Sequence, residues 1–265
     1  MDSLKKEINI PEELFRLRMK ELAEDVRIKF AKRGVSDIFD ILSKIAFLIR
    51  KPLDTHELSG FITYFEDRFI VYLNSGFTLG HERYTAAHEL YHIVYNEDIL
   101  KKEKVFLDKE RYKDEDIRAD VFAAEFLMPE DYVKEVFYRT VNVDMDEVLP
   151  KHIIRMHNHF KVSYKAMLKR LIQLKLCSMD RYFDLLEICS LDNKDKLQSL
   201  TRKEGYTIDL IIPSNTVYVP EEYVVYVKSN YENGRISYED MKKSFKFIDL
   251  DPMDFGYEKN KQYNM

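Results

Sequence analysis

The spacing of hydrophobic residues changes twice within the first hundred positions, and this constrains the fold more than any other feature of the chain. Apolar residues recur at helical spacing between 12 and 50, which predicts two or three helices. Two runs of β-branched and aromatic residues follow at 61–65 and 69–73, and they predict a β-hairpin. From 85 to 95 the spacing is helical again, with Thr85 suited to a position near the helix start.

The rest of the chain is predicted to be mainly helical. Pro129 ends one of these helices, because the residue before a proline disfavours helical geometry. One short apolar run, 206–212, is typical of a strand. The helices are expected at 115–128, 131–138, 150–159, 163–176 and 220–230. We therefore expect a helix-dominated α+β fold.

Composition is that of a folded protein outside membranes. The hydrophobic fraction of 45% and the charged fraction of 34% are ordinary for a globular domain and exclude global disorder. The N-terminal segment carries charges throughout, and no run of about 18 uncharged apolar residues occurs, so a cytoplasmic location is expected. Cys177 and Cys189 lack the paired spacing of a thiolate zinc site and are expected to be buried thiols.

Two histidines separated by three residues carry the clearest chemical signal. His88 and His92 lie four residues apart on a predicted helix, so both imidazoles face the same side and can bind one zinc ion. Glu89 follows the first histidine directly, where it can reach a water beside the metal rather than the metal itself. This spacing predicts a metal site with Glu89 as the base, and the alternative is a pair of surface histidines.

A catalytic zinc needs a third protein ligand, and an acidic cluster is the candidate source. Residues 114–116 are Asp-Glu-Asp at the start of the helix predicted over 115–128. Acidic residues are also common at helix N-termini, because the helix dipole favours negative charge there. From the residues alone, a ligand and a helix-capping function both remain open.

Two motifs resemble the ImmA/IrrE-like zinc metallopeptidases, a family that includes regulators encoded by mobile elements and phages. Residues 83–92 are Arg-Tyr-Thr-Ala-Ala-His-Glu-Leu-Tyr-His, where the family has Arg-Phe-Thr-x-Ala-His-Glu-Leu-Gly-His. Residues 119–129 are Ala-Asp-Val-Phe-Ala-Ala-Glu-Phe-Leu-Met-Pro, where the family has Ala-Asn/Asp-x-Phe-Ala-Ala-x-Leu-Leu-Met-Pro. The resemblance extends over residues 10–180.

The resemblance implies a third zinc ligand three residues before the second motif, at Asp116. The family has glutamate there, so the shorter aspartate requires a closer approach of its helix. Glu115 is the alternative ligand. Asp120 lies on the same helical face as Asp116 and could orient a ligand histidine. Tyr91 replaces a family glycine and narrows the space behind the motif.

A second group of histidines and a helix-turn-helix-like segment follow. One of His152, His157 and His159 is a candidate for stabilising a developing oxyanion, and the sequence does not choose among them. Residues 159–171 resemble the turn and second helix of a helix-turn-helix, with Ser163 as the cap. Because the net charge is −5, we expect protein recognition rather than DNA binding there.

By resemblance, the chain is expected to be a zinc (Zn²⁺) endopeptidase that cleaves a protein substrate, a helix-turn-helix transcriptional repressor of a mobile element or stress response. The alternative is a non-proteolytic regulator that keeps the zinc-site scaffold and binds a protein partner or DNA. No membrane partner is expected. The expected units are a zincin-like peptidase domain over 1–135, a helical helix-turn-helix-like domain over 136–192 and a C-terminal appendage over 193–265.

Overall fold

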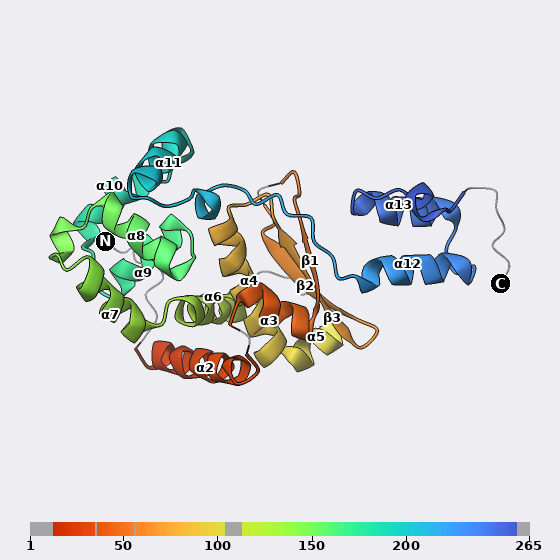
Figure 1. Cartoon of the computed structure of the whole chain (residues 1–265). Helices are drawn as coiled ribbons and strands as arrows, with labels where there is room; N and C mark the ends of the chain where they lie inside the picture. Colours follow the sequence, from red (N-terminus) through yellow and green to blue (C-terminus); the bar gives the residue numbers. More distant parts are fainter. Residues whose placement is uncertain (1–12, 35, 56, 104–112, 259–265) are drawn as a thin grey trace.

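A small sheet lies at the centre of a helix-rich α+β fold, as the sequence predicted (Figure 1). The sheet contains β1 (Phe47–Lys51), β2 (Gly60–Phe65) and β3 (Arg68–Asn74) in the order β1-β3-β2. Strand β1 pairs parallel with β3, whereas β2 pairs antiparallel with it. The computed structural model describes residues 13–34, 36–55, 57–103 and 113–258.

Strands β2 and β3 form the predicted hairpin, and β1 is a correction to the sequence analysis. The turn residues Glu66 and Asp67 have positive φ angles of 45° and 61°, as the tight turns of hairpins require. The sequence analysis predicted helices up to residue 50, but the helical region ends at Ile45 and β1 follows it. Leu48 lies opposite Val71 in the parallel ladder, and both side chains are fully buried. A short apolar run does not distinguish a buried strand from a helix, which explains the error.

Helix α4 (Leu79–Tyr95) packs against the sheet and against α6 (Lys113–Leu127). It begins earlier than expected, because Thr78 rather than Thr85 is its cap and accepts a hydrogen bond from the backbone of His81. The hydrophobic core between α4 and α6 includes Leu90 and Phe122, both fully buried. Around this pair lie α2 (Glu13–Ala31), α3 (Ile38–Ile45) and α5 (Glu97–Glu103).

A separate bundle of helices follows α6 and has a hydrophobic core of its own. Its helices are α7 (Glu130–Thr140), α8 (Pro150–Phe160), α9 (Tyr164–Gln173), α10 (Met179–Glu187) and α11 (Lys194–Lys203). Cys177 is buried here, Cys189 is half-buried, and both are free thiols. Ser163 caps α9 as predicted, accepting a hydrogen bond from the backbone of Ala166.

The bundle touches α4 at a glycine. A Cβ atom on Gly80 would lie 2.5 Å from the backbone nitrogen of Ser163 and 2.6 Å from the carbonyl carbon of Val162. Real Cβ atoms do not approach backbone this closely, so only glycine permits this approach. The beginning of α4 therefore lies directly against the turn between α8 and α9.

The segment after α11 crosses the sheet domain before the last helices begin. The run 206–212 is not a strand; it contains a 3₁₀-helix at Asp209–Ile211. Beyond it, Tyr218 and Arg50 exchange backbone hydrogen bonds at 2.8 and 2.9 Å, so this segment covers the edge of β1. The hydroxyl of Ser214 donates to Glu82, a fully buried carboxylate that also pairs with Arg50 at 2.7 Å. These backbone and side-chain hydrogen bonds hold this crossing segment against the sheet domain.

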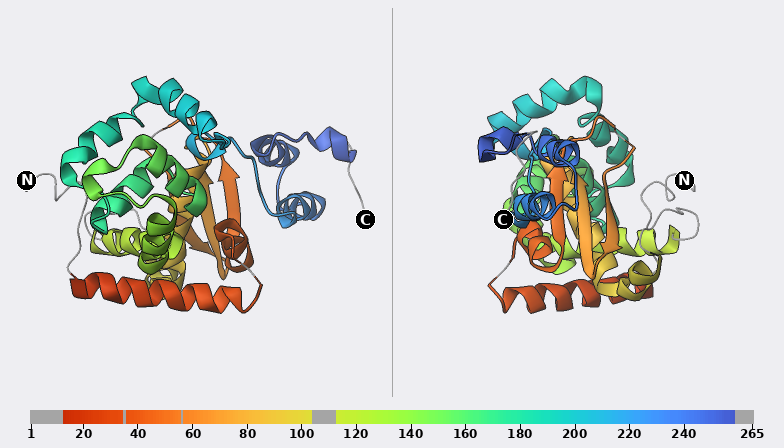
Figure 2. Two further views of the ribbon diagram at one scale, coloured as in Figure 1. Left: turned by 60° about the vertical axis from the view of Figure 1, so that its left-hand side comes forward. Right: turned by 90° about the vertical axis from the view of Figure 1, so that its right-hand side faces the viewer.

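Helices α12 (Glu222–Glu232) and α13 (Tyr238–Phe247) form a hairpin at the end of the described chain. Their own small core contains Val227, Met241 and Phe245. Figure 2 shows this hairpin beside the sheet, on the side away from the bundle of α7–α11. None of the described helices is both long enough and apolar enough to cross a lipid bilayer.

Candidate metal centre

Helices α4 and α6 bring the two motif histidines and one aspartate together. The Nε2 atoms of His88 and His92 lie 3.2 Å apart on one face of α4. Asp116, in the first turn of α6, places Oδ1 3.8 Å from Nε2 of His88 and 3.6 Å from Nε2 of His92. A point equidistant from these three atoms lies about 2.1 Å from each, which is the bond length of zinc to imidazole nitrogen and carboxylate oxygen. The cluster fits a zinc ion, and it could hold a metal through one atom of each residue.

The charges around the two imidazoles favour a cation. Burial lowers the pKa of His88, but the carboxylates of Asp116, Asp120 and Glu89 outweigh it and raise that pKa to about 10. For Asp116 burial acts to raise the pKa of the carboxyl. The hydrogen bonds and charges of His88 and His92 outweigh burial and hold that pKa well below its usual range. Three carboxylates around two histidines therefore create a region where positive charge is stabilised.

Asp120 orients His88 from outside the ligand cluster. Its Oδ1 lies 2.9 Å from Nδ1 of His88, and this contact directs the opposite nitrogen, Nε2, toward the cluster. The hydroxyl of Tyr84 donates to the backbone carbonyl of Asp120 at 2.7 Å. Tyr84 and His88 are one turn apart on α4, so these contacts fix α6 against the helix that carries the histidines.

His92 has an equivalent partner, Asn96, which the sequence analysis missed. Nδ1 of His92 lies 3.2 Å from Oδ1 of Asn96, the C-cap residue of α4. The amide of Asn96 donates in turn to Oε2 of Glu115 at 2.8 Å. Its position four residues after His92 was the only available signal, since i and i+4 positions meet on a helix.

Glu115 does not join the ligand cluster. Its Oε2 accepts hydrogen bonds from Asn96 and from the hydroxyl of Tyr91, the latter at 3.2 Å. Its Oε1 lies 3.1 Å from Arg118. Asp116, rather than Glu115, is therefore the acidic residue that α6 places beside the histidines. The hydroxyl of Tyr91 instead helps to hold Glu115.

Glu89 lies between His88 and His92 in the sequence of α4, and its side chain is buried. Burial raises the pKa of its carboxyl above the usual range, although His88 and His92 act in the opposite direction. A raised pKa suits a base that must take up a proton near neutral pH.

The three histidines considered as oxyanion candidates lie in the helical bundle, on α8. Within the described residues, no contact links them to the metal centre. His157 is fully buried, and burial lowers its pKa to about 4. Their ring nitrogens contact Leu149 N for His152, Val162 O for His157 and Tyr132 OH for His159.

Comparison with known proteins agrees with the position of this centre. Residues 45–172 match the family model of the IrrE N-terminal-like domain, a family of peptidases. This range contains the sheet, both helices of the metal centre and most of α9. A search of curated proteins found no match to this chain. The family match indicates a metallopeptidase-type function with a protein substrate. Residues 45–172 are therefore similar to the IrrE N-terminal-like domain of this peptidase family.

Proposed function

We propose that the chain is a zinc-dependent endopeptidase that hydrolyses a peptide bond in a protein substrate. The observation that carries the proposal is the ligand triangle of His88, His92 and Asp116, whose dimensions suit zinc, with the buried carboxyl of Glu89 beside it. The resemblance described above further suggests the substrate, a helix-turn-helix transcriptional repressor of a mobile element or stress response. This part of the proposal rests on the resemblance alone.

Each residue of the candidate metal centre has its own proposed role in peptide hydrolysis. His88, His92 and Asp116 would hold the zinc ion through Nε2, Nε2 and a carboxylate oxygen. Bound there, zinc supplies a Lewis acid that polarises the scissile carbonyl and acidifies water. Glu89 takes the proton of the attacking water and passes it to the leaving amine. Asp120 and Asn96 keep the two imidazoles in the required orientation.

Strand β2 is the proposed docking site for the extended substrate. It is the antiparallel edge strand of the sheet and packs against α4. A Cβ atom on Gly60 would lie 2.7 Å from Cγ2 of Thr85, so glycine allows β2 to approach the metal-binding helix closely. Edge strands recognise peptides by adding one strand through backbone hydrogen bonds, which supports this placement.

The decisive test combines a zinc measurement with a cleavage assay. We expect about one zinc per chain in the purified protein and little in His88→Ala, measured by elemental analysis. The zinc-loaded chain is then mixed with the repressor encoded by the neighbouring gene, and the products are identified by mass spectrometry. Cleavage at one site supports the proposal. Stoichiometric zinc without cleavage would favour the non-proteolytic regulator, and full zinc in His88→Ala would contradict the site itself.

A further inference from the structure

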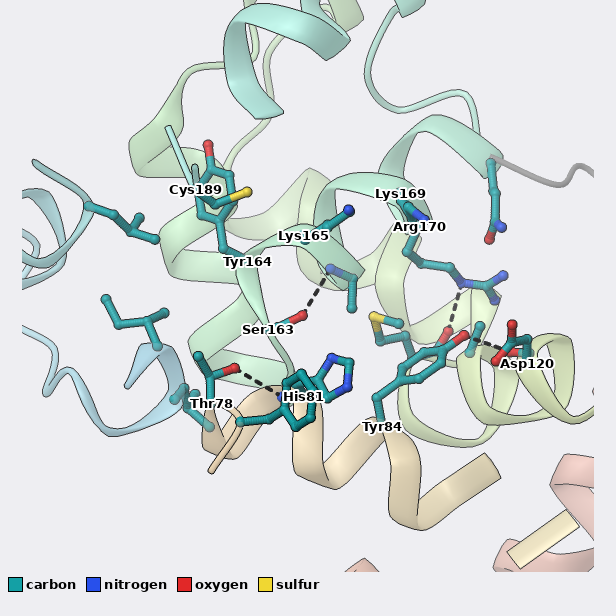
Figure 3. A pocket seen from close by; sticks show the side chains of 18 residues that line it. Thr78, His81, Tyr84, Asp120, Ser163, Tyr164, Lys165, Lys169, Arg170 and Cys189 are labelled. Carbon is teal, nitrogen blue, oxygen red and sulfur yellow. Dashed lines mark hydrogen bonds between the residues drawn. The ribbon is translucent and has the colours of Figure 1, made fainter. Parts of the chain in front are cut away.

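A cavity of about 500 Å³ lies between the beginning of α4 and the beginning of α9 (Figure 3). His81 and Tyr84 line it from α4, and Figure 3 shows side chains of α9 along the opposite wall. The volume is in the range of ligand sites. Of the residues assigned to the metal centre, Asp120 lines this cavity. The rest of the cavity has no role in the metal chemistry proposed above.

The cavity adjoins the metal centre. His81, Tyr84 and His88 are separated by three and four positions, so they lie on one face of α4. From His81 to His88 the helix rises about 10 Å, the length of about three extended residues. Asp120 belongs to both places, because it lines the cavity and contacts Nδ1 of His88. A peptide whose scissile bond lies at the metal centre can therefore place a nearby side chain in the cavity.

Residues that follow α9 in the chain complete the cavity. They come from the position just after α10, from α11 and from the 3₁₀-helix of the crossing segment, and they are Cys189, Leu197, Leu210 and Ile211. The crossing segment is held beside α4 here, because the amide of Leu79 donates to the carbonyl of Ile212 at 3.1 Å. All four lining residues lie outside the range 45–172 that matches the family model. This wall is therefore supplied by the C-terminal part of the chain.

Much of the lining is apolar, and it includes Phe77, Ala124, Met128, Leu197, Leu210 and Ile211. The polar side chains nearest the metal centre already have partners. Nε2 of His81 lies 2.9 Å from the hydroxyl of Ser59, and Asp120 contacts His88. Arg170 is almost fully buried and pairs with Glu125 at 2.7 Å. Burial of apolar surface is favourable, whereas burial of a charge without a partner is costly, so a large apolar side chain suits this cavity.

We propose that this cavity binds a large apolar side chain of the polypeptide substrate, such as leucine, methionine or phenylalanine, within about three residues of the cleaved bond. The inference rests on the proposed peptidase function and makes its substrate class more specific. Leu210 is the residue expected to determine this specificity, because it is half-buried and lines the cavity from the crossing segment. The C-terminal part of the chain then selects the substrate, although all three proposed metal ligands lie on α4 and α6.

A binding measurement tests the cavity without requiring catalysis. The zinc-loaded full chain carrying Glu89→Gln is titrated into three pools of fluorescein-labelled, end-blocked hexapeptides, and anisotropy is recorded. The pools carry Leu, Ala or Glu at one fixed position, and glycine, serine and alanine are mixed at the others. We expect the Leu pool to bind about tenfold more tightly than the Ala pool, because more apolar surface is buried.

A pair of matched leucine substitutions locates the preference. Leu210→Asn places an amide of similar size in the cavity wall, and the preference for Leu should fall to about threefold or less. Leu149→Asn makes the same change at a leucine of the bundle that is 42% exposed, and it should keep the preference. Thermal unfolding confirms that both variants are folded. An unchanged preference in Leu210→Asn, or its loss in Leu149→Asn, would contradict the proposed site.

The reactivity of Cys189 locates the bound peptide without any substitution in the cavity. This thiol lines the cavity and is half-buried, whereas Cys177 is buried in the bundle and serves as the internal reference. The bound Leu pool should slow alkylation of Cys189 by N-ethylmaleimide, measured by mass spectrometry, and leave Cys177 unchanged. Equal binding of the Leu and Ala pools, tighter binding of the Glu pool, or undiminished alkylation of Cys189 with the Leu pool bound would overturn the proposal.

The proposed function is tested separately, with the wild-type chain. If the zinc-loaded wild type cleaves neither the pools nor the repressor, the peptidase function is wrong, while a Leu preference with protection of Cys189 still supports an apolar peptide pocket. If the wild type cleaves the repressor but the Leu preference is absent, the pocket is wrong and the peptidase function stands.

Discussion

Asn96 accepts from His92 with one end of its side-chain amide and donates to Glu115 with the other, at 3.2 and 2.8 Å. Asn96 is 5% exposed and His92 is 3% exposed, so water does not readily replace either contact. The orientation of one proposed zinc ligand therefore depends on a residue at the end of α4 and on an acidic residue of α6. Partners of this kind fix the ring and the tautomer of a metal-binding histidine.

Removing this partner should weaken metal binding without abolishing it. Asn96→Ala is expected to lower zinc affinity about 10- to 100-fold, the usual cost of losing such a contact. Affinity is measured by competition with a chromophoric chelator, and thermal unfolding is recorded without metal. Asn233→Ala is a matched control, because Asn233 is also the C-cap residue of a helix but lies in the C-terminal hairpin. Equal affinities in the two variants would mean that Asn96 does not position His92.

The two neighbouring acidic residues should respond differently to substitution. Asp116→Ala removes a proposed ligand and should reduce zinc affinity more than Glu115→Ala, which removes only the support of Asn96 and Tyr91. Glu115→Gln keeps an acceptor for both donors and should lie closest to the wild type. Isothermal titration of zinc into the metal-free proteins gives the order. A larger loss in Glu115→Ala than in Asp116→Ala would make Glu115 the third ligand.

Glu89 should be necessary for hydrolysis and dispensable for holding zinc. Glu89→Gln keeps the shape of the side chain but leaves no base, and general-base catalysis is typically worth about 10²- to 10⁴-fold. Cleavage of the repressor should fall by at least that order, while zinc content and thermal stability change little. Loss of zinc from this variant would show a structural role, and retained full activity would exclude the proposed mechanism.

His157 should make the folded chain sensitive to acid. Burial lowers its pKa to about 4 in the folded state, and the ordinary value of 6.5 applies after unfolding. The unfolded chain therefore takes up a proton first as the pH falls, so stability is complete above pH 6.5 and is lost progressively down to about pH 4. The contribution reaches about 3 kcal/mol. Urea unfolding of His157→Gln should depend less steeply on pH in this interval, whereas the exposed His159→Gln should follow the wild type.

The crossing segment should matter more to stability than the terminal hairpin. A chain ending at residue 219 keeps the pairing of Tyr218 with Arg50 and the contact of Ser214 with Glu82. A chain ending at 205, just after α11, loses both and leaves the buried Arg50–Glu82 pair less supported. We expect the shorter chain to melt about 10 °C lower, the shift for roughly 3 kcal/mol. Equal melting temperatures by circular dichroism would contradict this role.

Spacing along the chain was sufficient for part of the site only. His88, Glu89 and His92 could be assigned because a single helix determines their relative positions. Asp116 was reached through the resemblance, since the register of α6 against α4 is a tertiary property. The partnership of Asn96 with Glu115 could not be predicted, because it depends on that same register. Strand β1 was missed for a related reason: its parallel pairing with β3 joins segments that the sequence leaves apart.

Gly80 has a further consequence for how this architecture can vary. The backbone of α4 touches the α8–α9 turn at this residue, with no room for a methyl group. A larger residue at this position would push the beginning of α4 away from the start of α9. The distance between α4 and the helical bundle is therefore set by a contact between backbones, which an exchange of side chains elsewhere would not change.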